Sequence, residues 1–237
     1  MRLDKYLADA GLGTRSAVKE DIRKGKVSIN GSLCKDPGFN VGPEDEVTHC
    51  GNPIDRSEHY YYMLNKPDGV ITATEDSSDK TVMDLLKDAK GRGLFPVGRL
   101  DKDTEGLLLI TEDGALSHRL LSPAHHVDKT YEVLCGGIVD TEDIKAIEEG
   151  IDIGDDRPTL PGRAVVISNS DEKSVIHLTI HEGRYHQVKR MMERLGKPVL
   201  HLKRISFGGI ALDEKLLPGE YRALTEDEIN ILKNAGR

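Results

Sequence analysis

A dense acidic turn runs directly into an apolar segment at residues 98–110, which read Gly98-Arg99-Leu100-Asp101-Lys102-Asp103-Thr104-Glu105-Gly106-Leu107-Leu108-Leu109-Ile110. The apolar run at 107–110 predicts a buried strand. The polar half has two interpretations from its residues alone. It is either a surface loop in which Asp103 or Thr104 caps a turn, or a reactive site whose paired acids, Asp101 and Asp103, flank a glycosidic bond. Spacing does not separate the two.

Length and composition indicate a globular protein of two compact units. Of the 237 residues, 37% are hydrophobic and 31% charged; Trp is absent, so Leu, Ile and Val must form the core. No uncharged apolar run approaches the roughly 18 residues of a membrane span, and the start Met1-Arg2-Leu3-Asp4 does not resemble a signal sequence. We therefore expect a cytoplasmic protein. The odd number and wide spacing of Cys34, Cys50 and Cys135 predict reduced, structural thiols.

The charge is unevenly distributed, although the formal net charge is -8. Residues 1–35 carry eight Lys and Arg against four acids, whereas residues 36–59 carry one Arg against six acids. Residues 181–204 again carry seven Lys and Arg against two acids. Two basic segments in an acidic chain are typical of a protein that binds a polyanion such as RNA, although basic, solvated helix faces would give the same pattern.

The N-terminal segment predicts a small module of two helices and a hairpin. Apolar residues three and four apart indicate a helix over residues 2–10, and Thr14 is placed to cap a second helix that ends at Gly25. The pair Asn30-Gly31 predicts a tight hairpin within residues 27–33. The second helix carries a basic stripe suited to a row of phosphates, formed by Arg15, Lys19, Arg23 and Lys26.

A Pro- and Gly-rich acidic segment at residues 36–59 predicts a short strand near Val47 and a linker at 55–59. We therefore predict two domains, residues 1–57 and 58–237. In the second, strands are expected at residues 60–64, 107–111, 130–135 and 174–180, and helices at 82–90, at 113–121, around the apolar stripe that begins at Val188, and after the Thr225–Glu228 capping box. Strands and helices without a regular alternation predict an α+β fold.

Taken as a whole, residues 98–109 resemble the signature of the RsuA/RluB/RluE/RluF family of pseudouridine synthases. Three further motifs resemble this family, in the same order along the chain: Asn65-Lys66-Pro67 with Gly69, Ser122-Pro123-Ala124-His125-His126 leading into Lys129-Thr130-Tyr131, and residues 182–191, which read EGRYHQVKRM. The N-terminal module resembles the S4 RNA-binding domain, through Arg2-Leu3-Asp4-Lys5, Thr14-Arg15-Ser16 and Gly25-Lys26-Val27. Residues 75–95 and 151–173 match least.

The resemblance implies an S4 domain followed by a pseudouridine synthase domain with a mixed, mainly antiparallel central sheet. It implies that Asp101 is the catalytic carboxylate, acting at the ribose C1′ or initiating departure of the uracil, and that Lys189 is its basic partner. Tyr131 would stack on the extruded uracil. The implied reaction breaks and rejoins one glycosidic bond, so we expect no cofactor and no metal. His125, His126 and His186 lack carboxylate or Cys partners at ligand spacing.

The resemblance also implies binding residues. Arg99 would occupy the space that the flipped nucleotide leaves or contact its phosphates, Leu202 would wall the uracil, and Arg184 would bind substrate. The residues expected to contact RNA more widely are Arg2, Lys5, Arg15, Lys19, Arg23, Lys26 and Arg190.

The function that the resemblance implies is the isomerisation of a ribosomal RNA uridine, and the motifs most resemble those of the enzyme for uridine 516 of 16S rRNA. The alternatives are a 23S rRNA synthase of the same family, a non-catalytic S4 ribosome-assembly factor, and a sugar or nucleoside hydrolase that uses Asp101 and Asp103 as paired acids. The hydrolase alternative does not explain the basic segments. We expect a monomer, because no coiled-coil heptads are present.

Overall fold

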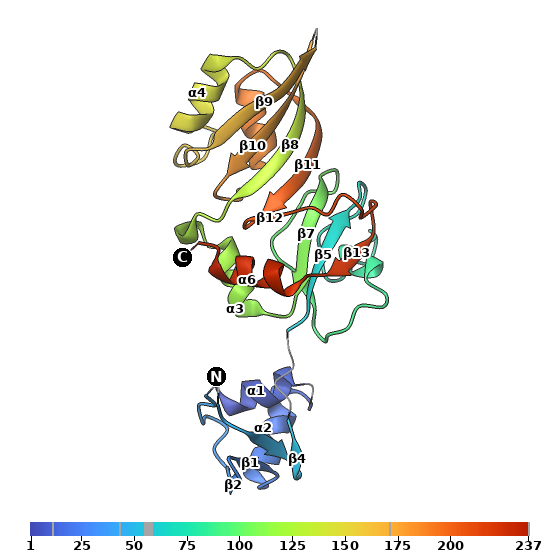
Figure 1. Ribbon diagram of the computed structural model, residues 1–237, viewed down its shortest axis with the longest axis vertical. Coiled ribbons are helices and arrows are strands. Elements are labelled where there is room, and N and C mark those ends of the chain that lie inside the picture. The colour runs from blue at the N-terminus through green and yellow to red at the C-terminus, as the bar shows by residue number, and fades with distance from the viewer. Residues whose placement is uncertain (11, 43, 55–58, 171, 237) are drawn as a thin grey trace. The chain divides into compact units, whose positions relative to one another are not determined.

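The computed structural model describes residues 1–10, 12–42, 44–54, 59–170 and 172–236, and divides into two units, Met1–His59 and Tyr60–Arg237 (Figure 1). The predicted boundary between residues 57 and 58 lies outside the described residues, as does most of the predicted linker. None of the described helices is long and apolar enough to cross a membrane.

The N-terminal unit packs two helices on a small antiparallel sheet. The helices are α1 (Leu3–Asp9) and α2 (Arg15–Arg23), and the sheet has the order β2-β1-β3-β4, with β1 (Val27–Ile29), β2 (Ser32–Leu33), β3 (Val47–His49) and β4 (Asn52–Pro53). The Thr14 hydroxyl accepts a hydrogen bond from the Ala17 amide, which confirms the predicted cap. Asn30 and Gly31 both have positive φ, so the tight Asn-Gly hairpin is confirmed.

The second unit is built on a nine-stranded mixed sheet with the order β13-β5-β7-β11-β8-β10-β9; β6 pairs with β7, and β12 with β11. Its strands are β5 (Tyr61–Lys66), β6 (Phe95–Pro96), β7 (Glu105–Thr111), β8 (Lys129–Gly136), β9 (Arg163–Ser170), β10 (Lys173–Ile180), β11 (Val199–Phe207), β12 (Ile210–Ala211) and β13 (Tyr221–Ala223). Its helices are α3 (Gly114–Leu121), α4 (Thr141–Glu149), α5 (Gln187–Arg194) and α6 (Glu226–Asn234), with 3₁₀ turns at Val82–Leu85 and Pro123–His125. The predicted α+β fold with a mainly antiparallel sheet is confirmed.

A single parallel pair among the described strands, β7 with β11, joins the two parts of this sheet. Its register pairs Glu105 with Lys203 and Gly106 with Arg204, and we call this junction the β7–β11 seam. Gly106 has φ 98°, and a Cβ there would collide with the backbone of Arg204. The glycine of the quoted stretch is therefore required by the close approach of the two strands.

The strands β5 and β7 are buried on both faces, which explains their nearly unbroken apolar sequences. One face packs with β8, β10 and α5 in the larger core, where Leu64, Leu108 and Met191 meet. The other face packs on α3 and α6, which lie side by side in Figure 1, through Leu109, Leu120 and other residues.

One predicted helix is wrong. Residues 82–90 form only the 3₁₀ turn Val82–Leu85, which Thr81 and Asp84 cap reciprocally, and Leu86 already leaves helical geometry at φ -95° and ψ 46°. Val82 and Leu86 are buried in the larger core, so the apolar spacing that indicated a helix serves a single anchored turn instead.

Candidate active site

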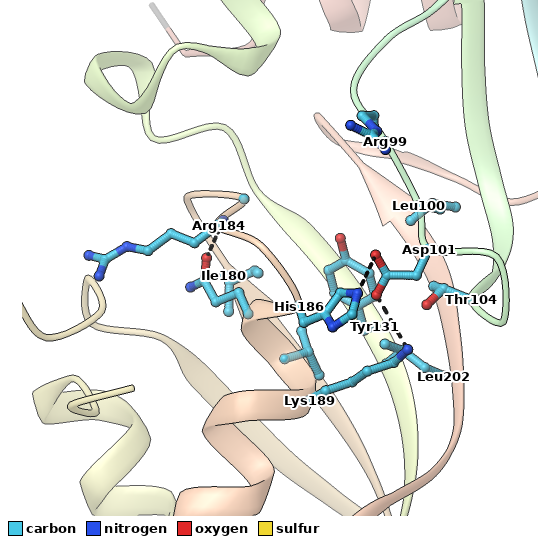
Figure 2. Close-up of a pocket in the computed structure, with 13 residues that line it drawn as sticks. Arg99, Leu100, Asp101, Thr104, Tyr131, Ile180, Arg184, His186, Lys189 and Leu202 are labelled. Carbon is cyan, nitrogen blue, oxygen red and sulfur yellow. Dashed lines mark hydrogen bonds and ion pairs between the residues drawn. The ribbon is translucent and has the colours of Figure 1, made fainter. Parts of the chain in front are cut away.

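A pocket of about 420 Å³ in the second unit collects residues from four separate parts of the chain (Figure 2). They come from the loop before β7, from β8, from the β10–α5 connection with the start of α5, and from β11. The lining residues are Arg99, Leu100, Asp101, Thr104, Tyr131, Ile180, Gly183, Arg184, His186, Gln187, Val188, Lys189 and Leu202. Every residue expected to be catalytic or to bind substrate lies in this lining.

The loop that carries Asp101 is fixed by hydrogen bonds to its backbone. The Thr104 amide donates to the Asp101 carbonyl at 3.1 Å, which closes a tight turn around the acid. On one side of the turn, the Thr72 hydroxyl donates to the Leu100 carbonyl at 2.7 Å and accepts from the Leu100 amide at 3.1 Å. Asp101 thus projects from a turn whose backbone polar groups are paired, as an aimed side chain requires.

Lys66 holds the same turn from the other side. Its ammonium, at the end of β5, donates to the carbonyls of Pro67, Lys102 and Thr104 at 3.0, 3.1 and 2.9 Å. The side chain is fully buried, and burial lowers the pKa of Lys66 to about 8 against the raising effect of nearby carboxylates. A buried cation that meets three carbonyls is a structural clamp on the Asp101 turn.

The carboxylate of Asp101 lies between two nitrogen groups, the Lys189 ammonium at 3.3 Å and the His186 Nε2 at 3.5 Å (Figure 2). Lys189 makes a shorter contact, 2.6 Å, with Asp103. Partial burial by itself would lower the pKa of Lys189, but the hydrogen bond that its ammonium donates to Asp103 and the charges of both acids raise that pKa above its ordinary value. The same hydrogen bond holds the pKa of Asp103 below its ordinary range. The ammonium thus stays charged beside Asp101.

Lys189 is in the first turn of α5, where the helix dipole disfavours a cation. The two carboxylates of the Asp101 turn face it and offset this cost. The sequence-based expectation that an anion lies opposite Lys189 therefore agrees with the geometry, with Asp103 as the nearer of two anions.

Tyr131 and Leu202 form the apolar wall of the pocket. Tyr131 lies on β8 and is 7% exposed, and Leu202 lies on the neighbouring strand β11 and is 5% exposed. In Figure 2 both lie beside the Asp101 carboxylate. An aromatic ring, an aliphatic side chain and a carboxylate in one pocket suit a planar base with its sugar attached.

Arg99 and Arg184 reach the pocket differently. Arg99 is exposed and lies apart from Asp101 in Figure 2. The Arg184 side chain points away from Asp101, and its guanidinium contacts Glu182 at 3.1 Å and the carbonyls of Arg157 and Pro158 at 2.7 and 2.8 Å. Arg184 is thus part of the pocket lining, but its guanidinium binds the segment after Ile151.

Comparison with known proteins identifies the two units. A family model described as RNA pseudouridylate synthase matches residues 60–194, and an S4 domain model matches residues 1–47. The chain belongs to the RNA pseudouridine synthase family. It is an RsuA-type synthase that acts on RNA.

Relatives of this synthase match it over nearly its whole length. A protein named "Uncharacterized RNA pseudouridine synthase YtzG" from Bacillus subtilis is 50% identical and covers 98% of each chain. The "Ribosomal small subunit pseudouridine synthase A" of Escherichia coli K12 is 40% identical, over 97% of this chain and 98% of its own. A solved pseudouridylate synthase has a TM-score of 0.69 at 40% identity, over 98% of this chain and 99% of that one.

The basic residues of the synthase's N-terminal unit are arranged around a buried acid. Asp4 is fully buried, and it contacts Arg2 at 3.2 Å, Arg15 at 3.1 Å and Lys19 at 3.5 Å. The hydrogen bond from Arg2, with that from Arg15, holds the pKa of Asp4 far below its ordinary value against the opposing effect of burial. The predicted stripe is therefore partly neutralised within its own unit.

Three other basic residues expected to contact RNA have different surroundings. Lys26 contacts Asp21 at 2.6 Å, whereas Lys5 and Arg23 are exposed. In the synthase domain, Arg190 contacts Asp155 at 2.5 Å and donates to the Ile153 carbonyl at 2.6 Å. Its guanidinium holds the same segment that Arg184 fastens, and it does not line the pocket.

Three residues of the site were missed from the sequence. Lys66 belongs to a quoted motif, but nothing in the sequence indicates that it clamps the Asp101 turn. His186, considered as a metal ligand and expected to contact backbone or phosphate instead, contacts Asp101. Thr104 is 2% exposed, and its hydroxyl has no hydrogen-bond partner among the described residues, although it lines the pocket. No group of His, Cys, Asp and Glu among the described residues could hold a metal ion.

Proposed function

We propose that the protein converts one uridine of small-subunit ribosomal RNA, uridine 516 of 16S rRNA, to pseudouridine, with Asp101 as the catalytic carboxylate. The observation that carries the proposal is the meeting of Asp101, Lys189, Tyr131 and Leu202 in one pocket. The choice of small-subunit RNA is supported by relatives at 40–42% identity that are named ribosomal small subunit pseudouridine synthase A.

In this proposal the Asp101 carboxylate starts the reaction at the ribose, either by attack on C1′ or by initiating departure of the uracil. The N1–C1′ bond breaks, the uracil turns within the pocket, and a C5–C1′ bond forms. The C5 hydrogen leaves as a proton, and N1 gains one, so the reaction is balanced without an oxidant or reductant. The Lys189 ammonium lies 3.3 Å from the carboxylate and offsets its negative charge.

The remaining roles follow from position. Tyr131 stacks on the uracil after it leaves its helix, and Leu202 on the neighbouring strand walls the uracil. Arg99, exposed at the pocket, contacts the RNA strand that the nucleotide leaves. Arg184 acts on substrate indirectly, because its guanidinium is bound within the chain.

The N-terminal unit supplies the wider RNA contacts through Arg2, Lys5, Arg15, Lys19, Arg23 and Lys26, with Arg190 of the synthase domain. We propose a cytoplasmic monomer whose partner is 16S rRNA, free or within an assembling small subunit. The choice of ribosomal RNA as partner is supported by the S4 domain match and by the names of the relatives.

The test is release of tritium from small-subunit rRNA labelled at uridine C5, since joining C5 to the sugar expels that hydrogen. We expect about one equivalent per RNA from the wild type and none from Asp101→Asn. Asp103→Asn is the matched control and retains activity, because it leaves Lys189 free to contact Asp101.

Three results would contradict the proposal. Equal loss of activity in Asp101→Asn and Asp103→Asn would favour a two-acid mechanism. Release from 23S rRNA but not from 16S rRNA would move the substrate to the large subunit, and no release from either RNA would favour a non-catalytic assembly factor.

A further inference from the structure

Tyr185 is an aromatic side chain with an unusually open position beside the pocket. It is 77% exposed, more than any other large apolar or aromatic side chain in the described parts of the chain. Its ring stacks on the ring of His186, with centroids 3.8 Å apart and planes 18° from parallel. His186 lines the pocket and contacts Asp101, so the exposed Tyr185 ring stacks directly on a residue of the pocket.

The ring pair is held by the backbone around it. His186 has the left-handed conformation, φ 48° and ψ 34°, which costs free energy for a residue other than glycine. The Tyr185 carbonyl accepts a hydrogen bond from Arg190 at 3.1 Å, and the Arg184 amide donates to the Gln187 side chain at 2.9 Å. Tyr185 is therefore exposed but attached to a fixed turn, which lowers the entropy cost of binding.

We propose that the Tyr185–His186 pair is a stacking site for an unpaired nucleobase next to the target uridine in the RNA chain. The inference rests on the proposed function. When the uridine leaves its stack, a neighbouring base loses a stacking partner and exposes an aromatic face. An open aromatic ring at the pocket replaces that partner, and it accepts any base because every base has a planar face.

The absence of Trp from the chain allows a direct test. The variant Tyr185→Trp has a single tryptophan in the proposed stacking position, and a base that stacks on it quenches its fluorescence. We expect quenching when a 16S rRNA fragment that contains the target binds. Quenching should weaken when an abasic nucleotide replaces the neighbour on either the 5′ or the 3′ side, and the side that has this effect identifies the stacked base.

Tyr60→Trp is the matched control, because Tyr60 is also exposed, at 38%, but stacks on Tyr62, which does not line the pocket, whereas Tyr185 stacks on the pocket residue His186. Its fluorescence should not depend on the abasic substitutions. In turnover assays, Tyr185→Ala should raise KM about 10-fold, with a smaller change in kcat, and Tyr185→Phe should restore KM. Tyr60→Ala should leave both parameters unchanged.

The result that would overturn the inference is unchanged tryptophan fluorescence in the Tyr185→Trp variant while a filter-binding assay shows that the RNA is bound. A KM increase in Tyr185→Ala that persists with RNA abasic at both neighbours would also overturn it. Wild-type tritium release separates the two proposals. Release without quenching in the Tyr185→Trp variant rejects the stacking site alone, whereas neighbour-dependent quenching without release rejects the synthase assignment alone.

Discussion

The Thr104 hydroxyl is a buried polar group that we expect to find its hydrogen-bond partner in the bound substrate. It lines the pocket beside Asp101 and is unpaired among the residues that the structure describes. Replacing an unpaired hydroxyl by a methyl group of the same shape removes a desolvation cost, so Thr104→Val should leave the free energy of unfolding unchanged or slightly higher. We expect kcat/KM to fall about 10-fold, the value of one lost hydrogen bond.

Denaturant unfolding and tritium release measure these two effects, and Thr104→Ser, which keeps the hydroxyl, should retain activity. If Thr104→Val is as active as the wild type, the hydroxyl does not contact substrate. If it is instead less stable, the hydroxyl has a structural partner in the folded chain.

Lys66 predicts a dependence of stability on alkaline pH. Its pKa is about 8 in the folded protein, below the ordinary lysine value, so above pH 8 the unfolded chain binds more protons than the folded one. The free energy of unfolding should therefore rise from pH 8 toward pH 10. Lys66→Met should reduce that slope by about 1 kcal/mol per pH unit.

Lys129→Met is the comparison, because burial also lowers the pKa of Lys129 to about 8. Both variants should flatten the slope, measured by denaturant unfolding at each pH. Activity at pH 7 should fall further in Lys66→Met than in Lys129→Met. Lys66 holds the Asp101 turn, whereas Lys129 donates to the Val127 carbonyl. A slope in Lys66→Met as steep as that of the wild type would mean that the Lys66 ammonium keeps an ordinary pKa.

At the scale of the element, helix α2 presents two kinds of cation. Both Arg15 and Arg23 are exposed, but Arg15 forms an ion pair with Asp4, whereas Arg23 forms none with the described residues. A cation that is already paired releases fewer counterions from RNA, so Arg23→Ala should flatten the dependence of RNA affinity on salt more than Arg15→Ala. Each full phosphate contact accounts for about 0.7–0.9 in the slope of log affinity against log salt.

Filter binding at several salt concentrations measures the slope, and turnover of bound RNA serves as the control because neither residue lines the pocket. The double variant Arg15→Ala with Arg23→Ala should weaken affinity while bound RNA is still converted. Equal slopes for the wild type and the double variant would remove this helix from the RNA contacts.

The elements that the sequence predicted are those whose signals are local. The Thr14 cap, the Asn30-Gly31 turn and the apolar run of β7 each depend on a few adjacent residues, and all three are confirmed. The strand β9 was missed because it is largely exposed, so it lacks the alternation of a half-buried strand. The error at residues 82–90 has the opposite cause, since apolar spacing there reflects anchoring of one turn.

The candidate site shows the same limit. The residues alone left two acids, Asp101 and Asp103, without distinct roles, and only the motifs taken together singled out Asp101. The clamp of Lys66 on the Asp101 turn, and the position of His186 beside the acid, depend on contacts between segments far apart in the chain. No local pattern in the sequence encodes those contacts.

At the scale of the whole synthase domain, Gly106 controls the β7–β11 seam. A side chain at this position meets the Arg204 backbone, and φ 98° is unfavourable for any residue with a Cβ. Gly106→Ala should lower the free energy of unfolding by more than about 1 kcal/mol, whereas Gly→Ala at an unstrained site leaves that free energy unchanged or raises it. Gly114→Ala is the matched control. Gly114 begins α3 with open space around it, so this variant should leave the free energy of unfolding nearly unchanged.

Thermal unfolding of both variants measures the difference, and equal melting temperatures would contradict the assigned role of the seam.

The seam also divides the site. Asp101 precedes β7 on one side of it, whereas Tyr131, Leu202 and Lys189 come from β8, β11 and α5 on the other. A chain in which the two parts of the sheet have not yet joined has no assembled catalytic pocket, even if its N-terminal unit already holds RNA. Under the proposed function, such a partly folded chain cannot break a glycosidic bond, so catalysis begins only once the seam has formed.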